Sequence, residues 1–492
     1  MLLAWSAIMP KTQPIVNKEV AAINQVKTEL SAITTPLETP QKPTSTTEII
    51  KFDQPAIEVS FIESQGAIKE VNFKKFKSHV FVVGEAFLLE DAGLNFKKQS
   101  QGQNEITFVH SDKEKIVTKR FTFANSSYSI KLDVTTRNIS NASIKLKPYL
   151  IIGTLNFALD PKNSTYQDIT AATTEKTLHP NSKKTQIFNG LKFISIRDRY
   201  FCLIVQSDSK DTIGFSKSIN KSETVVGLYG GEIELKPNVQ SGHSYASYLG
   251  PQEFNTIKAL NPDWTSVMYF GTFDFIAQLL LQLLEFLHGI VHNWGWAIVI
   301  LSVIIYLILY PLSIKQMRSM KEMQSLQPRI EELRRQHKDN PQKLNKEIME
   351  LYREHKVNPL GGCLPMLLQI PVFFALYQAL VRSVTLKGAN FLWIKDLSEP
   401  DKLFTLSKGL PLIGKDINIL PLLMMIGMFF QQKMTMKTGA GAGGNEQQKI
   451  MLIIFPLMFG FIFYNMPSGL VLYWFVNSAL MLIQQMRMVA KS

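Results

Sequence analysis

The carboxyl-terminal part of the chain contains four long runs without Asp, Glu, Lys or Arg. These runs cover residues 286–314, 357–381, 417–432 and 450–486. A helix needs about 20 mostly apolar residues to cross the hydrocarbon of a bilayer. The fourth run is long enough for two helices, and Asn465, Pro467 and Gly469 interrupt it near its middle. The pattern therefore predicts five transmembrane helices, at residues 293–312, 357–381, 417–432, 450–465 and 469–487.

The segment between the first two predicted spans is basic and periodic. It carries 11 Lys and Arg residues against 7 Asp and Glu residues between Leu312 and Val357. Its apolar residues form two seams on either side of Lys338-Asp339-Asn340-Pro341, which indicates a helical hairpin at residues 313–356. One seam is Leu326, Ile330 and Leu333, and the other is Leu344, Ile348 and Leu351. Because basic loops are typically cytoplasmic, we expect the hairpin, a Gly-rich loop at 433–449 and the tail at 488–492 to lie in the cytoplasm.

Residues 51–260 follow another pattern, in which apolar and polar residues alternate over short runs. Glu105-Ile106-Thr107-Phe108-Val109 and Tyr128-Ser129-Ile130-Lys131-Leu132 are two examples. Alternation with a period of two, broken by Gly, Asn, Ser and Asp clusters, predicts an antiparallel β-sandwich. The topology of the spans places this domain, and a loop at 382–416, on the outer side of the membrane, which is the periplasmic side in a Gram-negative cell.

Three segments connect or precede these domains. Residues 273–292 form a mostly apolar helix with one polar stripe, which predicts an amphipathic helix lying at the membrane interface. Residues 11–50 include a Thr- and Pro-rich stretch, which favours a flexible tether. The ten residues before it are apolar but too few to span a bilayer, and we interpret them as the remnant of a first transmembrane helix.

Charge and cysteine content exclude several classes of protein. The net charge of +13 is compatible with nucleic acid or an anionic membrane, but the chain contains no nucleic-acid-reading motif. The two cysteines, Cys202 and Cys363, are too few for a disulfide scaffold or a cysteine-based metal site. His288 and His292 have a metal-ligand spacing without an evident third ligand. We therefore expect no metal, no cofactor and no enzymatic activity.

Polar residues inside the predicted spans are the candidate functional groups. They are Ser302, Tyr306, Gln369, Tyr473 and Asn477. A polar group in a bilayer is costly unless it is hydrogen-bonded or hydrated. These residues are therefore expected either to line a water-filled concavity or to form ordinary hydrogen bonds between helices.

Several motifs along residues 270–490 resemble the YidC membrane protein insertase family of the Gram-negative type, which has a large periplasmic domain. The motifs are Asn293-Trp294-Gly295, Tyr310-Pro311-Leu312, Gln327-Pro328, Asn358-Pro359-Leu360-Gly361-Gly362-Cys363, Gln369-Ile370-Pro371 and Pro467-Ser468-Gly469-Leu470-Val471-Leu472-Tyr473-Trp474. The resemblance implies an inner-membrane insertase and folding chaperone that acts without nucleotide hydrolysis, alone or with the Sec translocon. It also implies nascent membrane proteins as clients, contact with membrane lipids, and a ribosome or targeting factor as partner of the hairpin.

The resemblance further implies a hydrophilic groove, open to cytoplasm and lipid, that contacts clients. On this sequence its residues would be Ser302, Tyr306, Gln369, Tyr473, Trp474 and Asn477. Family members usually carry an Arg four residues before Tyr-Pro-Leu, where this chain has Tyr306, so we expect a polar groove without charge. Two other functions are weighed against this one. A small-solute transporter or channel lacks support because paired intramembrane charges are absent, and a sugar-processing enzyme lacks an acid–base pair.

Overall fold

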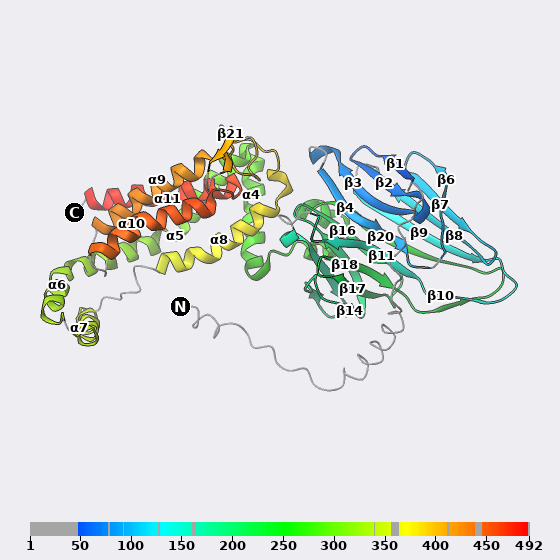
Figure 1. Ribbon diagram of the computed structural model, residues 1–492, viewed down its shortest axis with the longest axis horizontal. Helices are drawn as coiled ribbons and strands as arrows, with labels where there is room; N and C mark the ends of the chain where they lie inside the picture. The colour runs from blue at the N-terminus through cyan, green and yellow to red at the C-terminus, as the bar shows by residue number, and fades with distance from the viewer. Residues whose placement is uncertain are drawn as a thin grey trace. The chain divides into compact units, whose positions relative to one another are not determined.

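The computed structural model describes residues 48–76, 79–91, 93–125, 128–159, 164–338, 340–355, 364–410, 414–437 and 445–490 (Figure 1). Several expected features fall on the remaining residues. They are the helix remnant at 1–10, most of the tether at 11–50, the Asn358–Cys363 motif and the centre of the Gly-rich loop, which all lie outside the described residues.

The amino-terminal part consists of antiparallel sheets, as the alternating pattern predicts. The largest has nine strands in the order β13 (Thr177–Leu178), β12 (Asp168–Thr173), β15 (Leu191–Arg197), β16 (Phe201–Ser207), β20 (Gln240–Pro251), β9 (Ser129–Asn138), β8 (Lys115–Phe123), β7 (Glu105–Ser111) and β6 (Lys97–Gln101). A five-stranded sheet has the order β14 (Gln186–Phe188), β17 (Ile213–Asn220), β18 (Glu223–Tyr229), β11 (Tyr149–Asn156) and β5 (Leu88–Leu89). A four-stranded sheet contains β1 (Ile49–Asp53), β2 (Ile57–Ile62), β3 (Ala67–Phe73) and β4 (His79–Ala86), and β10 (Ile144–Leu146) pairs with β19 (Ile233–Leu235).

The inward-facing positions of these strands build a core rich in phenylalanine. The Phe61 ring lies 5.2 Å from that of Phe108 and 5.0 Å from that of Phe121, measured between centroids. Lys119 is fully buried in the same core, and its Nζ donates to the carbonyl oxygens of Phe87 at 2.6 Å and Gln65 at 3.2 Å. Burial lowers the pKa of Lys119 to about 7, because desolvation disfavours the ammonium form.

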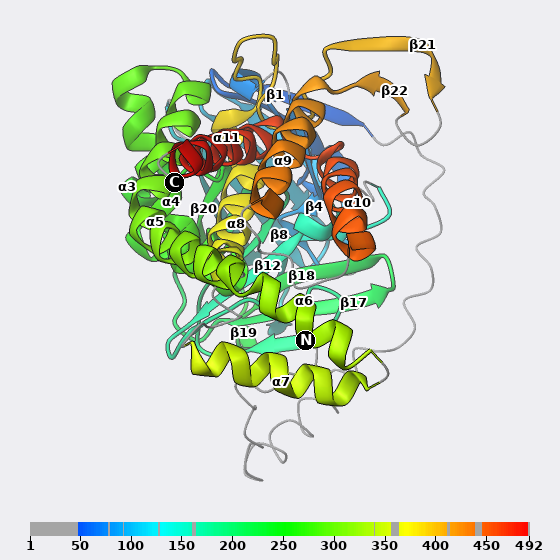
Figure 2. The ribbon, with the colours of Figure 1, turned by 90° about the vertical axis from the view of Figure 1, so that its left-hand side faces the viewer.

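The carboxyl-terminal part is helical, as the charge-free runs predict (Figure 1). Its helices are α3 (Phe254–Leu260), α4 (Asp274–Val291), α5 (Trp294–Ser325), α6 (Gln327–Gln336), α7 (Pro341–Glu354), α8 (Leu364–Arg382), α9 (Ile419–Lys437), α10 (Asn445–Phe463) and α11 (Ser468–Ala490). Helix α9 packs against both α10 and α11, and α11 packs against α5 (Figure 2). Helix α4 packs against α5 and α8.

Length and composition separate these helices into two groups. In the described part of the chain, Gly271–Val291, Trp294–Lys315 and Ser468–Arg487 are long and apolar enough to cross a membrane, whereas the apolar stretches Ile419–Met434 and Leu452–Phe463 are shorter. The first of these contains the helix expected at the interface. One face of α4 leaves Phe275, Leu279, Phe286 and Ile290 more than half exposed.

Two boundaries differ from the expectations. Helix α5 does not end at Leu312 but continues to Ser325 with Pro311 inside it, because nothing stops the helix where its residues become polar. The loop at 382–416 is not irregular throughout, since β21 (Phe404–Leu410) and β22 (Gly414–Ile417) pair as a short antiparallel hairpin.

Candidate functional site

Two helices present polar residues with the same spacing on the faces that meet. Helix α5 carries Ser302, Tyr306 and Ser313, and α11 carries Tyr473, Asn477 and Gln484. Both sets are separated by four and then seven residues, which keeps each set on one side of its helix. Because α5 packs against α11, most of these side chains lie in the contact region between the two helices.

Hydrogen bonds join this region to α8. The Tyr306 hydroxyl and the Ser313 hydroxyl each donate to Oε1 of Gln484 at 3.0 Å. On α8, Nε2 of Gln369 donates to the Tyr473 hydroxyl in a short hydrogen bond. Three helices that are distant in sequence are therefore connected by amide and hydroxyl groups without a formal charge.

Several polar atoms of this network stay without a protein partner. Oε1 of Gln369 and Nε2 of Gln484 are buried and make no hydrogen bond within the described structure. Asn477, which is 7% exposed, has no hydrogen-bonding neighbour there either. A cavity of about 20 Å³ opens beside Gln369 and Asn477, lined by Tyr306, Leu309, Leu312, Ser313, Gln369, Asn477 and Met481. This is enough room for about one water molecule next to Gln369 and Asn477. Gln484 does not line the cavity, but it binds Tyr306 and Ser313, which do.

Two of the expected groove residues lie elsewhere. Ser302 is fully buried, and its hydroxyl donates to the carbonyl of Ile298 in its own helix at 2.7 Å, so it is satisfied without the cavity. Trp474 follows Tyr473 by one position and therefore faces a direction about 100° away around α11. Its ring packs among Phe373, Phe459 and Phe463, with centroid distances of 5.2 to 5.8 Å.

Conversely, Ser313 and Gln484 belong to the network but were not among the expected residues. Ser313 falls beyond the predicted end of the first span, and Gln484 lies near the end of the last one. Their common spacing from Tyr306 and Asn477, seven residues in each case, was the signal that could have identified them.

The helical hairpin forms at the expected place, with one change in its contacts. Leu326, Ile330, Leu351 and Tyr352 are buried together, and Leu333 and Ile348 pack against them. Leu344 is half-buried and is not part of this cluster, whereas Tyr352, which was not expected there, is. Helix α7 begins with Pro341 after Asn340, whose side chain accepts from the backbone N–H of Lys343 at 3.1 Å.

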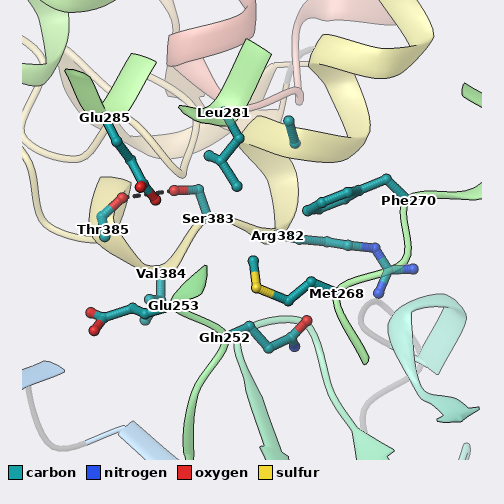
Figure 3. A pocket seen from close by; sticks show the side chains of 11 residues that line it. Gln252, Glu253, Met268, Phe270, Leu281, Glu285, Arg382, Ser383, Val384 and Thr385 are labelled. Carbon is teal, nitrogen blue, oxygen red and sulfur yellow. Dashed lines mark hydrogen bonds between the residues drawn. The ribbon is translucent and has the colours of Figure 1, made fainter. Parts of the chain in front are cut away.

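At the other end of α8, a small cavity of about 10 Å³ separates α4 from the end of β20 (Figure 3). Its polar lining comes from Gln252, Glu253, Glu285, Arg382, Ser383 and Thr385. The hydroxyls of Ser383 and Thr385 lie 2.8 Å apart. Its volume is too small for a ligand larger than water. Among the described residues, no group of three or more His, Cys, Asp or Glu side chains is arranged to hold a metal ion.

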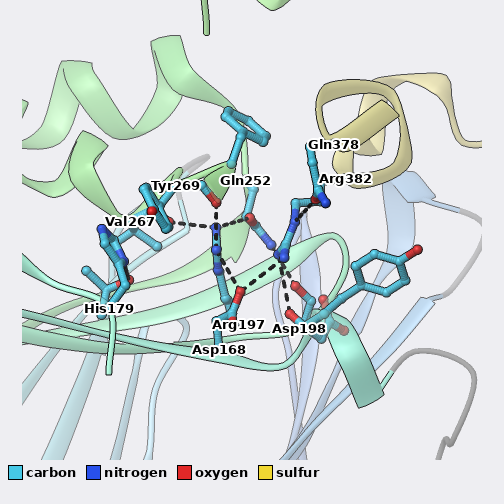
Figure 4. A network of polar contacts seen from close by, with 12 residues as sticks. Asp168, His179, Arg197, Asp198, Gln252, Val267, Tyr269, Gln378 and Arg382 are labelled. Carbon is cyan, nitrogen blue, oxygen red and sulfur yellow. Dashed lines mark hydrogen bonds and ion pairs between the residues drawn. The ribbon is translucent and has the colours of Figure 1, made fainter. Parts of the chain in front are cut away.

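A charged cluster beside this cavity joins α8 to the β-sheet domain (Figure 4). Oδ2 of Asp168 accepts from Nη2 of Arg197 at 2.8 Å and from Nη2 of Arg382 at 3.0 Å. Arg197 is 1% exposed and also donates to the carbonyl oxygens of Val267 at 2.8 Å and Tyr269 at 2.8 Å. One carboxylate thus pairs with two arginines from different parts of the chain.

The tyrosine and arginine residues around this cluster add further contacts. The hydroxyls of Tyr166 and Tyr377 lie 3.1 Å apart. Arg199 donates through Nε to the carbonyl of Val381 at 2.9 Å and through Nη2 to that of Ser398 at 3.0 Å. These contacts fix the last turn of α8, the helix that carries Gln369 in the polar network.

Comparison with known proteins identifies relatives along nearly the whole chain. Residues 286–492 match the family model of the 60Kd inner membrane protein, and residues 87–283 match that of the YidC periplasmic domain. The membrane protein insertase YidC of Pelobacter propionicus is 33% identical over 476 residues, which is 87% of this chain and 84% of the relative. The same protein of Syntrophobacter fumaroxidans is 36% identical over 380 residues, covering 75% of this chain and 68% of the relative.

Among solved structures, an active YidC insertase with its first transmembrane domain resolved matches 96% of this chain and 99% of its own, at 19% identity and a TM-score of 0.42. The sequence relatives and the two family models cover both the β-sheet domain and the apolar helices. The chain therefore belongs to the YidC family of inner-membrane insertases.

Proposed function

We propose that this protein inserts transmembrane segments of client membrane proteins by admitting their polar flanks into the space between α5, α8 and α11. The observation that carries the proposal is the pair of buried, unpaired amide atoms in this network, Oε1 of Gln369 and Nε2 of Gln484. Gln369 lines a water-sized cavity, and Gln484 binds two other residues of its wall, Tyr306 and Ser313. An interface made only for stability would leave few such atoms unpaired, because each costs free energy. Polar groups that lack a partner at rest can bind water or client groups during insertion.

The energy for insertion comes from the client. Each square ångström of apolar surface removed from water contributes about 25 cal/mol, so transfer of an apolar helix into lipid is strongly favourable. The insertase only has to lower the barrier for the polar flank, and nucleotide hydrolysis is not required. An uncharged network does this by replacing part of the hydration of the flank.

Short helices on one side of the network lower the same barrier. At 1.5 Å per residue, the apolar stretches Ile419–Met434 and Leu452–Phe463 are about 24 Å and about 18 Å long, against roughly 30 Å of hydrocarbon. A bilayer around them is expected to thin or to admit polar flanks. The dry path for a client is then shorter near α9 and α10.

The distribution of basic residues supports an orientation. We place the β-sheet domain in the periplasm and the C-terminus in the cytoplasm, since Lys315 and Arg487 lie at the same end of α5 and α11. Helix α4 would rest at the periplasmic surface with its exposed apolar face toward lipid. The hairpin of α6 and α7 would meet a ribosome or targeting factor, and the Sec translocon would dock beside the helices for some clients.

Insertion of a client into proteoliposomes containing the purified full chain tests the proposal. Tyr306→Ala should reduce insertion more than Tyr306→Arg, because arginine restores a polar group in the cleft. Ser302→Ala is the matched control, since Ser302 is satisfied within its own helix, and it should leave insertion nearly unchanged. Full activity of Tyr306→Ala on every client would remove Tyr306 from the mechanism. Solute uptake without any client insertion would favour a transporter instead.

A further inference from the structure

The β-sheet domain contains a cavity of about 320 Å³, much larger than the cavities of about 10 Å³ and 20 Å³ described above. Its floor consists of three adjacent strands of the nine-stranded sheet. Thr136 of β9 pairs in register with Val117 of β8 on one side and with Ser241 of β20 on the other. Val134 and His243 form the next paired position, so all these side chains lie on one face of the sheet.

The opposite wall comes from the other sheets and the segments between them. Leu89 ends β5 and Leu94 follows it in the chain, Leu146 belongs to β10, and Tyr149 begins β11. Ile233 of β19 completes this wall. A cleft between sheets that is large enough for a small organic molecule is a usual form of a ligand site in proteins.

The charges around the cavity balance one another. Three lysines and three carboxylates line it, and they are Lys115, Lys145, Lys147, Glu90, Asp91 and Glu232. Lys115 forms a short ion pair with Asp91, while Nζ of Lys145 lies 3.0 Å and that of Lys147 lies 3.5 Å from the Glu232 carboxylate. Burial and the neighbouring Glu90 carboxylate raise the pKa of the Tyr149 hydroxyl. With three lysines facing three carboxylates, the cavity favours a neutral ligand over an ion.

Neutral hydrogen-bonding groups, by contrast, are left without partners. The side chains of Thr136, Ser241, His243 and Tyr245 line the cavity and make no hydrogen bond to any residue that the structure describes. Tyr245 is only 3% exposed, but its hydroxyl oxygen is not among the fully buried unpaired atoms and so remains accessible from the cavity. Tyr245 is the buried member of this set, and Thr136, Ser241 and His243 are partly exposed at the cavity. Their hydrogen-bonding groups are therefore free to bind a ligand or water inside it.

The remaining lining is apolar, with Leu94, Val117 and Val134 between the polar groups. We propose that this cavity is a binding site for a neutral, hydroxyl-rich ligand of about one or two sugar rings. Such a ligand presents hydroxyls to Thr136, Ser241, His243 and Tyr245, and carbon–hydrogen faces to the apolar side chains and the Tyr149 ring. The site is separate from the polar network of α5, α8 and α11, and ligand binding does not depend on insertion.

The test is ligand-detected NMR on the full chain in phospholipid nanodiscs, because glycosidic detergents would themselves compete for the site. The probes are lactose and maltotriose, with a neutral tripeptide and inorganic phosphate as alternatives. Tyr245→Phe and Thr136→Val each remove one hydroxyl at nearly constant volume, and each should weaken sugar binding about three- to tenfold. Gln240→Ala, an exposed change on the same strand but the other face, should leave binding unchanged.

Three results would overturn the proposal. They are an absence of sugar binding at millimolar concentration, sugar binding that the two hydroxyl-removing variants leave unaltered, and binding of the tripeptide or phosphate in preference to the sugars. Saturable sugar binding that both variants weaken, in protein whose insertion activity is unchanged, would support it. Failure of the insertion assay has no bearing on this outcome, so the two proposals are tested separately.

Discussion

Replacing Gln484 with leucine separates the stabilising role of the polar network from its proposed role in insertion. Gln484→Leu removes the acceptor of the Tyr306 and Ser313 hydroxyls, both at 3.0 Å. It puts an apolar side chain of similar size in place of the amide. Hydrogen bonds between transmembrane helices contribute about 0.6 kcal/mol each on average, so two of them account for about 1 kcal/mol. The substitution also removes the buried, unpaired Nε2 group, which costs about 1–3 kcal/mol in the wild-type protein.

These two effects oppose each other, and the free energy of unfolding should therefore change by no more than about 1–2 kcal/mol in either direction. Insertion should fall severalfold, because the cleft loses its amide. Stability is measured by unfolding in mixed micelles, and insertion is measured in proteoliposomes. Ser478→Ala is the control, since Ser478 is also buried on α11 but faces away from Gln484.

Two outcomes would refute this reasoning. If Gln484→Leu inserted clients as well as the wild-type protein does, the polarity of the cleft would not be used. If the variant lost more than about 3 kcal/mol of stability and insertion fell only as far as the amount of folded protein did, Gln484 would be a structural residue. The free-energy cost assigned to its unpaired Nε2 would then be wrong.

Three further changes test the packing and electrostatics of the fold. The folded-state pKa of Lys119 lies at about 7, below its ordinary value of 10.5, so the native state binds fewer protons than the unfolded state between these values. The free energy of unfolding should therefore rise with pH from about 7 to 10.5. Lys119→Met should flatten that rise, as measured by urea unfolding. Asp168→Asn leaves two buried arginines without their carboxylate and should lower the unfolding free energy by about 2–3 kcal/mol, less than the roughly 3–5 kcal/mol of a fully buried pair. Equal stability would show that the backbone carbonyls of Val267 and Tyr269 suffice for Arg197. A methyl group at Gly295 would overlap the Phe391 ring, so Gly295→Ala should cost about 1–3 kcal/mol, and an unchanged melting temperature would show that the ring moves freely.

The sequence predicted the fold class because each half carries a simple pattern. Alternation over short runs appears as antiparallel sheets, and uncharged runs appear as α5, α8, α9, α10 and α11. It could not predict how the strands join into sheets of nine, five and four, since that order depends on contacts between distant segments. The continuation of α5 beyond Leu312 was missed for another reason. Hydropathy indicates where a helix leaves the lipid, but it does not indicate where the helix itself ends.

The candidate site was only partly predictable. Tyr306, Gln369, Tyr473 and Asn477 do meet, because regular spacing fixes the side of a helix on which a residue lies. Trp474 is displaced by the geometry of α11. A list of polar residues does not show which hydroxyls bond to their own helix, as Ser302 does, and which face a neighbour. Those distinctions depend on helix packing, which the sequence does not report directly.

The most direct test of the central proposal is photocrosslinking from position 306 to a ribosome-held nascent membrane protein. A photoreactive amino acid replaces Tyr306 in the cleft, and the matched position is Phe286, which is exposed on the outer face of α4. We predict crosslinks to the client from position 306 that appear as its transmembrane segment leaves the ribosome and disappear after insertion, with few from position 286. Client crosslinks absent from position 306, or equally frequent at both positions, would contradict the cleft as the route of insertion.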